Sequence, residues 1–290
     1  MNRAKAKRKP LVFYKMHALG NDFMVIDGVT QSVALEAAQI ARWGDRHTGV
    51  GFDQLLIIEP PTINDADFYF RIYNTDGSSA EQCGNGTRAV ALLARHLQLS
   101  KKQSLQWQSA AGMINTVYTN PQQIETTMTV PVLNLPEVPF AADAATPLEA
   151  NGREFRVAVG DDSYTLTPVS MGNPHGVMFV DNIFETDVAT IGANLTRHAA
   201  FPAAANIGFC QVVDRQFVRL RVFERGVGET QACGSGACAA VVAARLHDKV
   251  DPKVKVSLPV GKLRISWPAL ESPVTMSGAA TLVFKGELQT

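Results

Sequence analysis

Two short turns of the same pattern, Cys-Gly-x-Gly, begin at Cys83 and at Cys233. Each turn follows an extended segment and precedes an Ala-rich apolar stretch that is typical of a buried helix. The glycines permit a tight turn and leave backbone N–H groups uncovered, and the helix directs its positive end at them. Such a site lowers the pKa of a cysteine and also binds carboxylates. We therefore predict two activated thiols, each beside an anion-binding site.

Two activated thiols on opposite sides of one carbon atom suit inversion of its configuration. One thiolate removes the α-proton from one face, and the other group, as a thiol, delivers a proton to the opposite face. Backbone N–H groups that hold the α-carboxylate would stabilise the carbanion-like intermediate. Water must be excluded, so we expect the protein to close over its substrate.

The other two cysteines, Cys210 and Cys238, lie in apolar segments and are expected to be small buried hydrophobic residues. Four cysteines are too few for a disulfide scaffold in a chain of 290 residues, so reduced thiols and a cytoplasmic location are expected. We expect no metal, because no cluster of His and Cys completes a tetrahedral set. No Cys-x-x-Cys redox motif is present.

The sequence also repeats itself. A shift by 150 positions, the separation of the two key cysteines, places residues 71–74 on 221–224. A shift by 152 positions places Gly20-Asn21 on Gly172-Asn173. Duplication of this kind predicts two similar domains related by a pseudo-two-fold axis, with a cleft between them where the cysteines face each other.

Apolar periodicity predicts a strand-rich chain with four helices. The helices are expected at 34–43 with Ser32 as the N-cap, from just after Gly86 to Leu97, at 188–198, and from just after Gly236 to Leu246. Strands are expected at 11–16, 23–27, 54–59, 67–74, 104–108, 113–119, 124–130, 154–159, 165–170, 177–180, 208–213, 218–224, 253–258, 262–267 and 280–285. The Pro-rich stretch 131–147 is predicted to be a linker.

Composition excludes several classes of partner. Apolar residues make up 46% of the chain and charged residues 19%, so a sizeable core can form. Basic and acidic residues are balanced at 27 each, which gives no reason to expect nucleic acid or a membrane. Five basic residues precede Pro10, and we interpret them as a solvated tail. No apolar segment of secretory or transmembrane type follows.

Six motifs occur in an order that resembles the diaminopimelate epimerases over nearly the whole chain from Phe13 onward. They are residues 15–23, 51–54, 74–77 leading to 82–86, 171–175, 206–208 and 224–236. The resemblance implies an α/β (α+β) fold of two pseudo-symmetric domains, each a strand-rich barrel-like sheet around a central helix. The expected domains are 1–129 plus 279–290, which carries Cys83, and 130–278, which carries Cys233.

The resemblance also implies a function. It implies interconversion of LL- and meso-2,6-diaminopimelate in lysine biosynthesis, without pyridoxal phosphate, metal or any other cofactor. The partner is a small-molecule substrate, and the protein is expected to be a cytoplasmic homodimer.

The resemblance assigns site residues as well. Cys83 and Cys233 correspond to the proton-transfer groups, and Arg225 to the residue that binds the distal carboxylate through a bidentate fork. Gly84, Asn85, Gly234 and Ser235 correspond to the binding sites for the α-carboxylate. His175, in a supporting role, and Glu224 correspond to residues at the α-amino end. Further substrate-binding residues, whose amides both donate and accept, are Asn21, Gln54, Asn74, Asn173 and Asn206.

Plainer interpretations stay open for some of these residues. Asn21 and Asn173 follow glycines and would also suit turns, and His175 after Pro174 would suit a structural role. Gln54 has the weakest support. A proline or hydroxyproline racemase would share the two-cysteine logic, and a phenazine-biosynthesis isomerase would share the fold without the cysteine pair. A non-catalytic amino-acid-binding module would have no need of two activated thiols.

Overall fold

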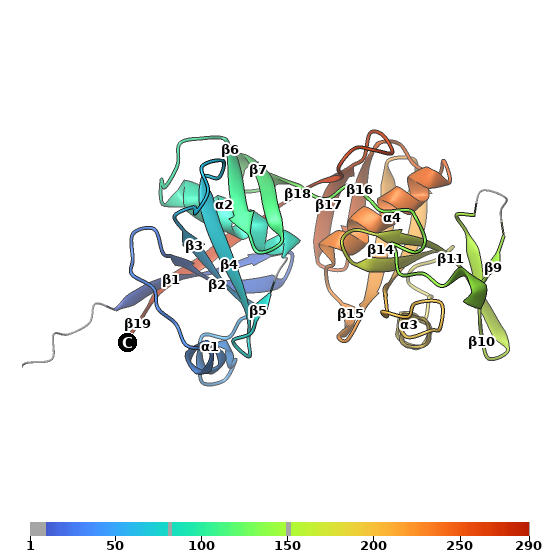
Figure 1. The fold of residues 1–290 in the computed structure, drawn as a ribbon, viewed down its shortest axis with the longest axis horizontal. Helices are drawn as coiled ribbons and strands as arrows, with labels where there is room; N and C mark the ends of the chain where they lie inside the picture. Colours follow the sequence, from blue (N-terminus) through green and yellow to red (C-terminus); the bar gives the residue numbers. More distant parts are fainter. Residues whose placement is uncertain (1–9, 81–82, 149–151, 290) are drawn as a thin grey trace, which may run out of the picture. The chain divides into compact units, whose positions relative to one another are not determined.

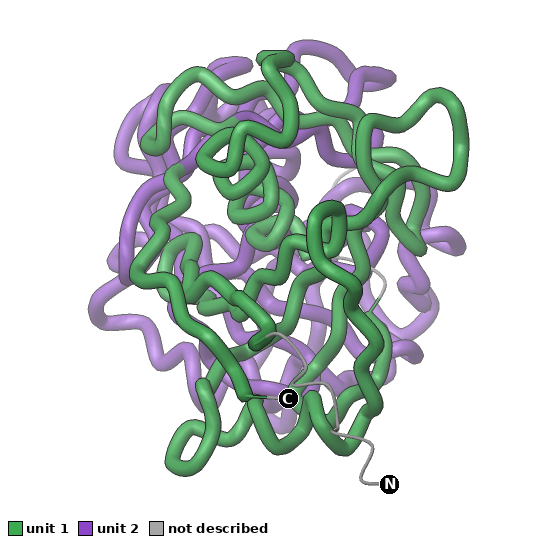
Figure 2. The backbone as a smooth tube through the Cα atoms, turned by 90° about the vertical axis from the view of Figure 1, so that its left-hand side faces the viewer, with its two compact units in different colours: residues 1–124, 279–290 green, residues 125–278 purple. Residues whose placement is uncertain are grey.

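The computed structural model describes residues 10–80, 83–148 and 152–289. Its backbone forms two compact units, Met1–Ile124 with Ala279–Thr290, and Glu125–Gly278 (Figure 1; Figure 2). The C-terminal residues from Ala279 onward thus belong to the first unit. The basic tail before Pro10 and Gln82 of the family motif lie outside the described residues.

The first unit is a mixed sheet wrapped around one helix. Its strands are β1 (Leu11–Ala18), β2 (Asn21–Asp27), β3 (Gln54–Glu59), β4 (Phe68–Asn74), β5 (Ser79–Ala80), β6 (Ser104–Ser109), β7 (Gly112–Asn120) and β19 (Thr281–Leu288), and β8 (Gln123–Thr127) runs on into the second unit. Its helices are α1 (Ala37–Gly44) and α2 (Gly84–His96). The main sheet has the order β19-β1-β2-β3-β4-β6-β7. Helix α2 contacts strands near both ends of this order, β19 and β7, so the sheet curls around the helix.

Alternating burial explains how the strands cover the helix. In β6, Leu105, Trp107 and Ser109 are buried, whereas the residues between them are exposed or partly exposed. This period of two directs one face of the strand at the core. Helix α2 is buried all round from Asn85 to Ala94, as its apolar sequence predicts.

The second unit follows the same plan. Its strands are β9 (Thr146–Pro147), β10 (Phe155–Val159), β11 (Asp162–Ser170), β12 (Pro174–Phe179), β13 (Asn206–Asp214), β14 (Phe217–Glu224), β15 (Gly228–Thr230), β16 (Lys253–Leu258), β17 (Gly261–Ser266) and β18 (Thr275–Gly278). Its helices are α3 (Val188–Thr196), α4 (Gly234–Leu246) and a 3-10 turn, η1 (Ala142–Ala144). Helix α4 is buried from Gly236 to Ala244 and contacts β11, β12, β13, β14 and β17.

The two units share one order of strand pairings. In the first unit, the pairs from β1 to β7 alternate between antiparallel and parallel, and the parallel pairs are β2–β3 and β4–β6. In the second, the pairs from β11 to β17 alternate in the same way, and the parallel pairs are β12–β13 and β14–β16. Each parallel pair is joined by a crossover, as parallel strands require. The predicted strand-rich α/β fold class is confirmed, while the predicted domain boundaries and two-fold relation stay predictions.

Two local predictions are wrong. Residues 131–147 are not a free linker, because Val138 and Phe140 are buried in the core of the second unit and Val132 pairs with Ser170. Ser32 is not the N-cap of the first helix, which begins at Ala37 after Glu36. Apolar anchors among the prolines account for the first error. None of the described helices combines the length and the apolar character needed to cross a bilayer.

Candidate functional site

Cys83 lies at the N-cap of α2, where its Sγ atom accepts a hydrogen bond from the backbone N–H of Gly86 at 3.2 Å. The predicted strand-to-helix turn is thus present. Burial nevertheless raises the pKa of the Cys83 thiol to about 11, although the side chain keeps partial exposure. We expected the helix terminus to lower this pKa. That expectation is wrong for the free protein, because desolvation outweighs the N–H of Gly86 and the charge of Arg88.

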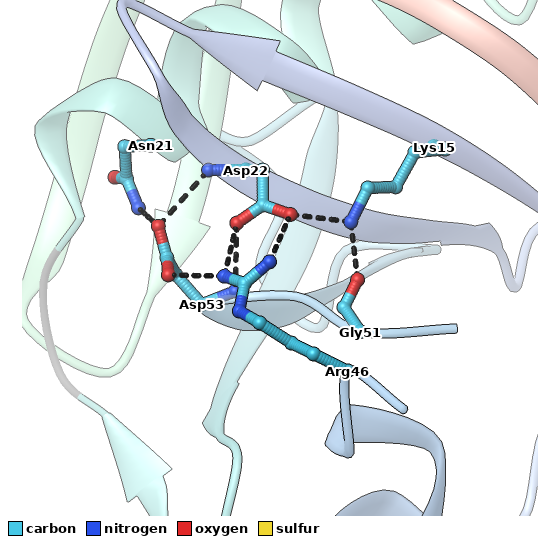
Figure 3. A network of polar contacts seen from close by, with 6 residues as sticks. All are labelled: Lys15, Asn21, Asp22, Arg46, Gly51 and Asp53. Carbon is cyan, nitrogen blue, oxygen red and sulfur yellow. Dashed lines mark hydrogen bonds and ion pairs between the residues drawn. The ribbon is translucent and has the colours of Figure 1, made fainter. Parts of the chain in front are cut away.

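Asn21 lies between Cys83 and a network of charged side chains. Figure 3 shows how Asn21 contacts this network through Asp53. Its Oδ1 atom lies 3.9 Å from Cys83 Sγ and accepts from Asn85 Nδ2 at 3.4 Å. Its Nδ2 atom donates to Asp53 at 2.8 Å. Asn21 follows Gly20, whose φ of 80° places it in the left-handed region that favours glycine. The turn interpretation of this residue is therefore compatible with a side chain that faces the thiol.

Gln54 and Asn74 form a second polar pair in the first unit. They face each other across β3 and β4, and Gln54 Nε2 donates to Asn74 Oδ1 at 3.4 Å. Asn74 Nδ2 donates in turn to the hydroxyl of Ser78 at 3.1 Å. Gln54, the weakest assignment, therefore directs its amide at another predicted site residue.

Cys233 occupies the matching position at the N-cap of α4, with an exposed fraction of 5%. Its Sγ atom lies 3.6 Å from the hydroxyl of Ser235. Burial raises the pKa of the Cys233 thiol, and the charge of Glu224 raises it further. Glu224 accepts a hydrogen bond from the hydroxyl of Thr230. The predicted lowering of this pKa is therefore also wrong in the free protein.

A separate group of predicted residues gathers at β12 and β13. His175 and Asn206 are direct partners in the parallel pair, and His175 Nε2 lies 3.1 Å from Asn173 Oδ1. Asn206 Oδ1 accepts from the backbone N–H of Arg225 at 2.8 Å. Burial and the charge of Arg225 lower the pKa of His175 to about 3, so the imidazole is neutral near pH 7. His175 Nδ1 is buried without a hydrogen-bond partner among the described residues, so a ligand could satisfy it.

Asp53, Thr230 and Arg88 contact predicted site residues but were not themselves predicted. Asp53 and Thr230 lie within the quoted motifs, but no feature of the sequence distinguishes them from the residues beside them. Arg88 had a usable signal, because it is a charged residue near the start of an apolar helical stretch whose other basic residues, Arg95 and His96, lie at its far end. It is fully buried and donates to Asn85 Oδ1 at 2.7 Å. Cys210 and Cys238 are buried thiols outside any disulfide, as expected of structural residues.

Comparison with solved structures agrees with this architecture. A hydroxyproline epimerase from Agrobacterium vitis superposes with a TM-score of 0.67 at 14% identity, covering 97% of this chain and 93% of the other. A phenazine biosynthesis protein of the PhzF family from Bacillus anthracis gives 0.66 at 16% identity, covering 97% and 100%. At these identities the likeness establishes the fold alone.

Relatives found by sequence comparison are much more similar to this chain than these solved structures are. The diaminopimelate epimerase from Ectopseudomonas mendocina is 47% identical over 279 residues, and the one from Azotobacter vinelandii is 46% identical over the same length. Each alignment covers 96% of this chain and 99% of the relative. The family model described as diaminopimelate epimerase matches residues 13–133 and 167–283. The predicted resemblance is confirmed, and the chain belongs to the diaminopimelate epimerase family.

Proposed function

We propose that this protein interconverts LL- and meso-2,6-diaminopimelate, with Cys83 and Cys233 as the paired acid and base. One observation carries the proposal. In both units a cysteine occupies the N-cap position of a buried helix, and a Cβ added at the glycine three residues later, Gly86 or Gly236, would lie 3.1 Å or 3.2 Å from its sulfur. The repeated turn therefore reserves space for a sulfur atom in both units, which a purely structural cysteine pair would not require.

The chemistry follows from two such groups. The thiolate of one cysteine takes the α-proton and becomes a thiol, while the other thiol gives its proton to the opposite face and becomes a thiolate. Net charge is conserved, and the roles exchange in the reverse direction. In the free protein burial raises the pKa of both thiols. The α-ammonium group of a bound amino acid would favour the thiolate, because a nearby positive charge lowers a thiol pKa.

The remaining predicted residues suit a long zwitterionic substrate. Gly84, Asn85, Gly234 and Ser235 stand in the first turns of α2 and α4, where free N–H groups bind a carboxylate. Arg225 is exposed, and its Nη1 atom donates to the carbonyl oxygen of Ala203 at 2.8 Å. Its fork therefore keeps donors for a distal carboxylate. Neutral His175 suits a position near the α-amino group.

The assembly implied by the family belongs to the same proposal. We propose domains 1–129 plus 279–290 and 130–278, which close over the substrate, in a cytoplasmic homodimer. Support for self-association comes from β19, where Val283 and Phe284 are 54% and 46% exposed. As consecutive residues of β19 they present two large apolar side chains that a second copy would cover.

The test is turnover of LL-diaminopimelate by reduced protein in deuterated water. We expect meso product that carries α-deuterium. Cys83→Ala and Cys233→Ala should each lower turnover about 10²–10⁴-fold, the usual contribution of a general acid or base. Cys210→Ala is the matched control, because this thiol is buried in β13 and has no part in the mechanism. Exchange with proline but not with diaminopimelate would move the assignment to a proline racemase.

A further inference from the structure

The amide of Asn21 lies between a carboxylate and the Cys83 thiol. On one side, Nδ2 donates to Asp53 Oδ2 at 2.8 Å. On the other side, Oδ1 lies 3.9 Å from Cys83 Sγ and accepts from Asn85 Nδ2 at 3.4 Å. The thiol therefore faces the oxygen of this amide, which accepts hydrogen bonds, and not its NH₂ group, which donates them.

Charged groups at both ends determine which way the amides point. An ionised carboxylate only accepts hydrogen bonds, so Asp53 requires the NH₂ group of Asn21. A guanidinium only donates, so Arg88 requires the oxygen of Asn85, which it meets at 2.7 Å. The NH₂ group of Asn85 is then left to face Asn21 Oδ1. Rotation of either amide by 180° would bring two donors or two acceptors together.

Asp53 is itself held in place by several donors (Figure 3). Arg46 donates to Asp53 at 2.7 Å and forms a fork with Asp22 at 2.7 and 3.1 Å. The backbone N–H of Asp22 also donates to Asp53, and Lys15 donates to Asp22. Burial pushes the pKa of Asp22 up, but the hydrogen bonds and charges of Arg46 and Lys15 outweigh it and lower the pKa to about 2. The Arg46 guanidinium therefore bridges the two carboxylates and, with the backbone N–H of Asp22, orients the carboxylate of Asp53.

We propose that Asp53 is a positioning residue that keeps the carbonyl oxygen of Asn21 facing Cys83, and so holds this thiol protonated until substrate binds. A thiol S–H gains an acceptor from this oxygen, whereas a thiolate would face its lone pairs. Among the described residues, the charged groups that act on Cys83 are Asp53, which disfavours the thiolate, and Arg88, which favours it. The inference rests on the proposed role of Cys83 in proton transfer.

The test is the alkylation of Cys83 by iodoacetamide in the ligand-free, full-length protein, followed by peptide mass spectrometry from pH 7 to 10. Only the thiolate reacts, so the rate reports the thiol pKa. In Asp53→Asn, no carboxylate requires the NH₂ group of Asn21, so the weaker contact with Asn85 alone opposes rotation and the NH₂ group turns toward the sulfur in part of the molecules. We expect Cys83 to react about tenfold faster than in the wild type at pH 8, equivalent to about one unit in pKa. Asn21→Ala removes the acceptor and should also raise the rate, so the inference stays testable if one variant fails to fold.

Two controls separate positioning from a change in charge. Asp22→Asn removes a neighbouring carboxylate but leaves the Asn21–Asp53 hydrogen bond in place, so the alkylation rate should stay within about twofold of wild type. In an Asn21→Ala background, Asp53→Asn should raise the rate clearly less than in the wild-type background, because only the weak direct effect of the Asp53 charge on Cys83 is then left. An unchanged rate in Asp53→Asn, or an equal increase in both backgrounds, would overturn the inference. Alkylation needs no turnover, so this outcome is distinct from a failure of the proposed function.

Discussion

The second glycine of each Cys-Gly-x-Gly turn lies against the sulfur of that turn. A Cβ at Gly86 would lie 3.1 Å from both Cys83 Sγ and the Cδ1 atom of Leu56. Gly86→Ala should therefore displace the sulfur while α2 still forms, and turnover should fall by up to about 10²-fold, as expected for a displaced catalytic group. Gly208→Ala is the control, because its new Cβ would meet Leu220 at 3.6 Å and Val177 at 4.0 Å, both ordinary contacts. Wild-type turnover by folded Gly86→Ala protein would contradict this account of the turn.

At the scale of residues, the sequence indicates where the thiols lie but not their pKa values. The repeat and the glycines place both cysteines at helix N-termini, and the structure agrees. Desolvation depends on which side chains pack around the sulfur, and those come from distant segments. The bond from Asn21 to Asp53 joins residues 32 positions apart. No local sequence pattern predicts this hydrogen bond, although both residues lie in motifs that were identified from the sequence.

At the scale of elements, Arg88 connects α2 to the C-terminal segment of the chain. It is fully buried and donates to Asn85 Oδ1 and to the carbonyl oxygen of Ala279, just before β19. Arg88→Met would leave these acceptors buried without their donor. We expect a loss of about 2–4 kcal/mol in the free energy of unfolding, measured by urea denaturation. Arg95→Met, at the exposed end of the same helix, should cost less than about 1 kcal/mol. Equal losses in the two variants would refute the proposed connection.

Elements with strong periodicity were predicted well, and those that depend on distant partners were not. The bounds of β3 and β16 match the prediction, because alternation or a continuous apolar run marks both strands. Short strands such as β15 were missed, since its three residues pair with β14 and carry no pattern of their own. The stretch 131–147 was misassigned because proline content favours a linker, while Val138 and Phe140 bind it to the core. Packing against distant residues therefore determines the structure of this stretch.

At the scale of the whole molecule, duplication left two units with the same pairing order but different charges near their thiols. Asn74 and Arg88 in the first unit fall, at the 150-residue shift, on Glu224 and Cys238 in the second. The cation Arg88 therefore acts on Cys83 more strongly than the anion Asp53 does, whereas the charge that acts on Cys233 is the anion Glu224. The presence of Arg88 near Cys83 and of Glu224 near Cys233 both make Cys83 the more acidic thiol. The two groups are thus chemically distinct even though the fold around them repeats.

Oxidation offers a test of whether the two units bring their thiols together. Both cysteines are free, and they belong to different units. A disulfide requires Cα atoms about 4.4–6.8 Å apart, so a Cys83–Cys233 bond can form only if closure brings the two turns face to face. We expect a mild thiol oxidant such as diamide, which accepts the two hydrogens, to inactivate the protein with formation of this bond. Reductant should restore activity, and peptide mass spectrometry should identify the linked pair in wild type but not in Cys83→Ala. Inactive, oxidised protein in which both thiols are still free would show that the two cysteines do not meet, and the two-thiol mechanism would then have to be abandoned.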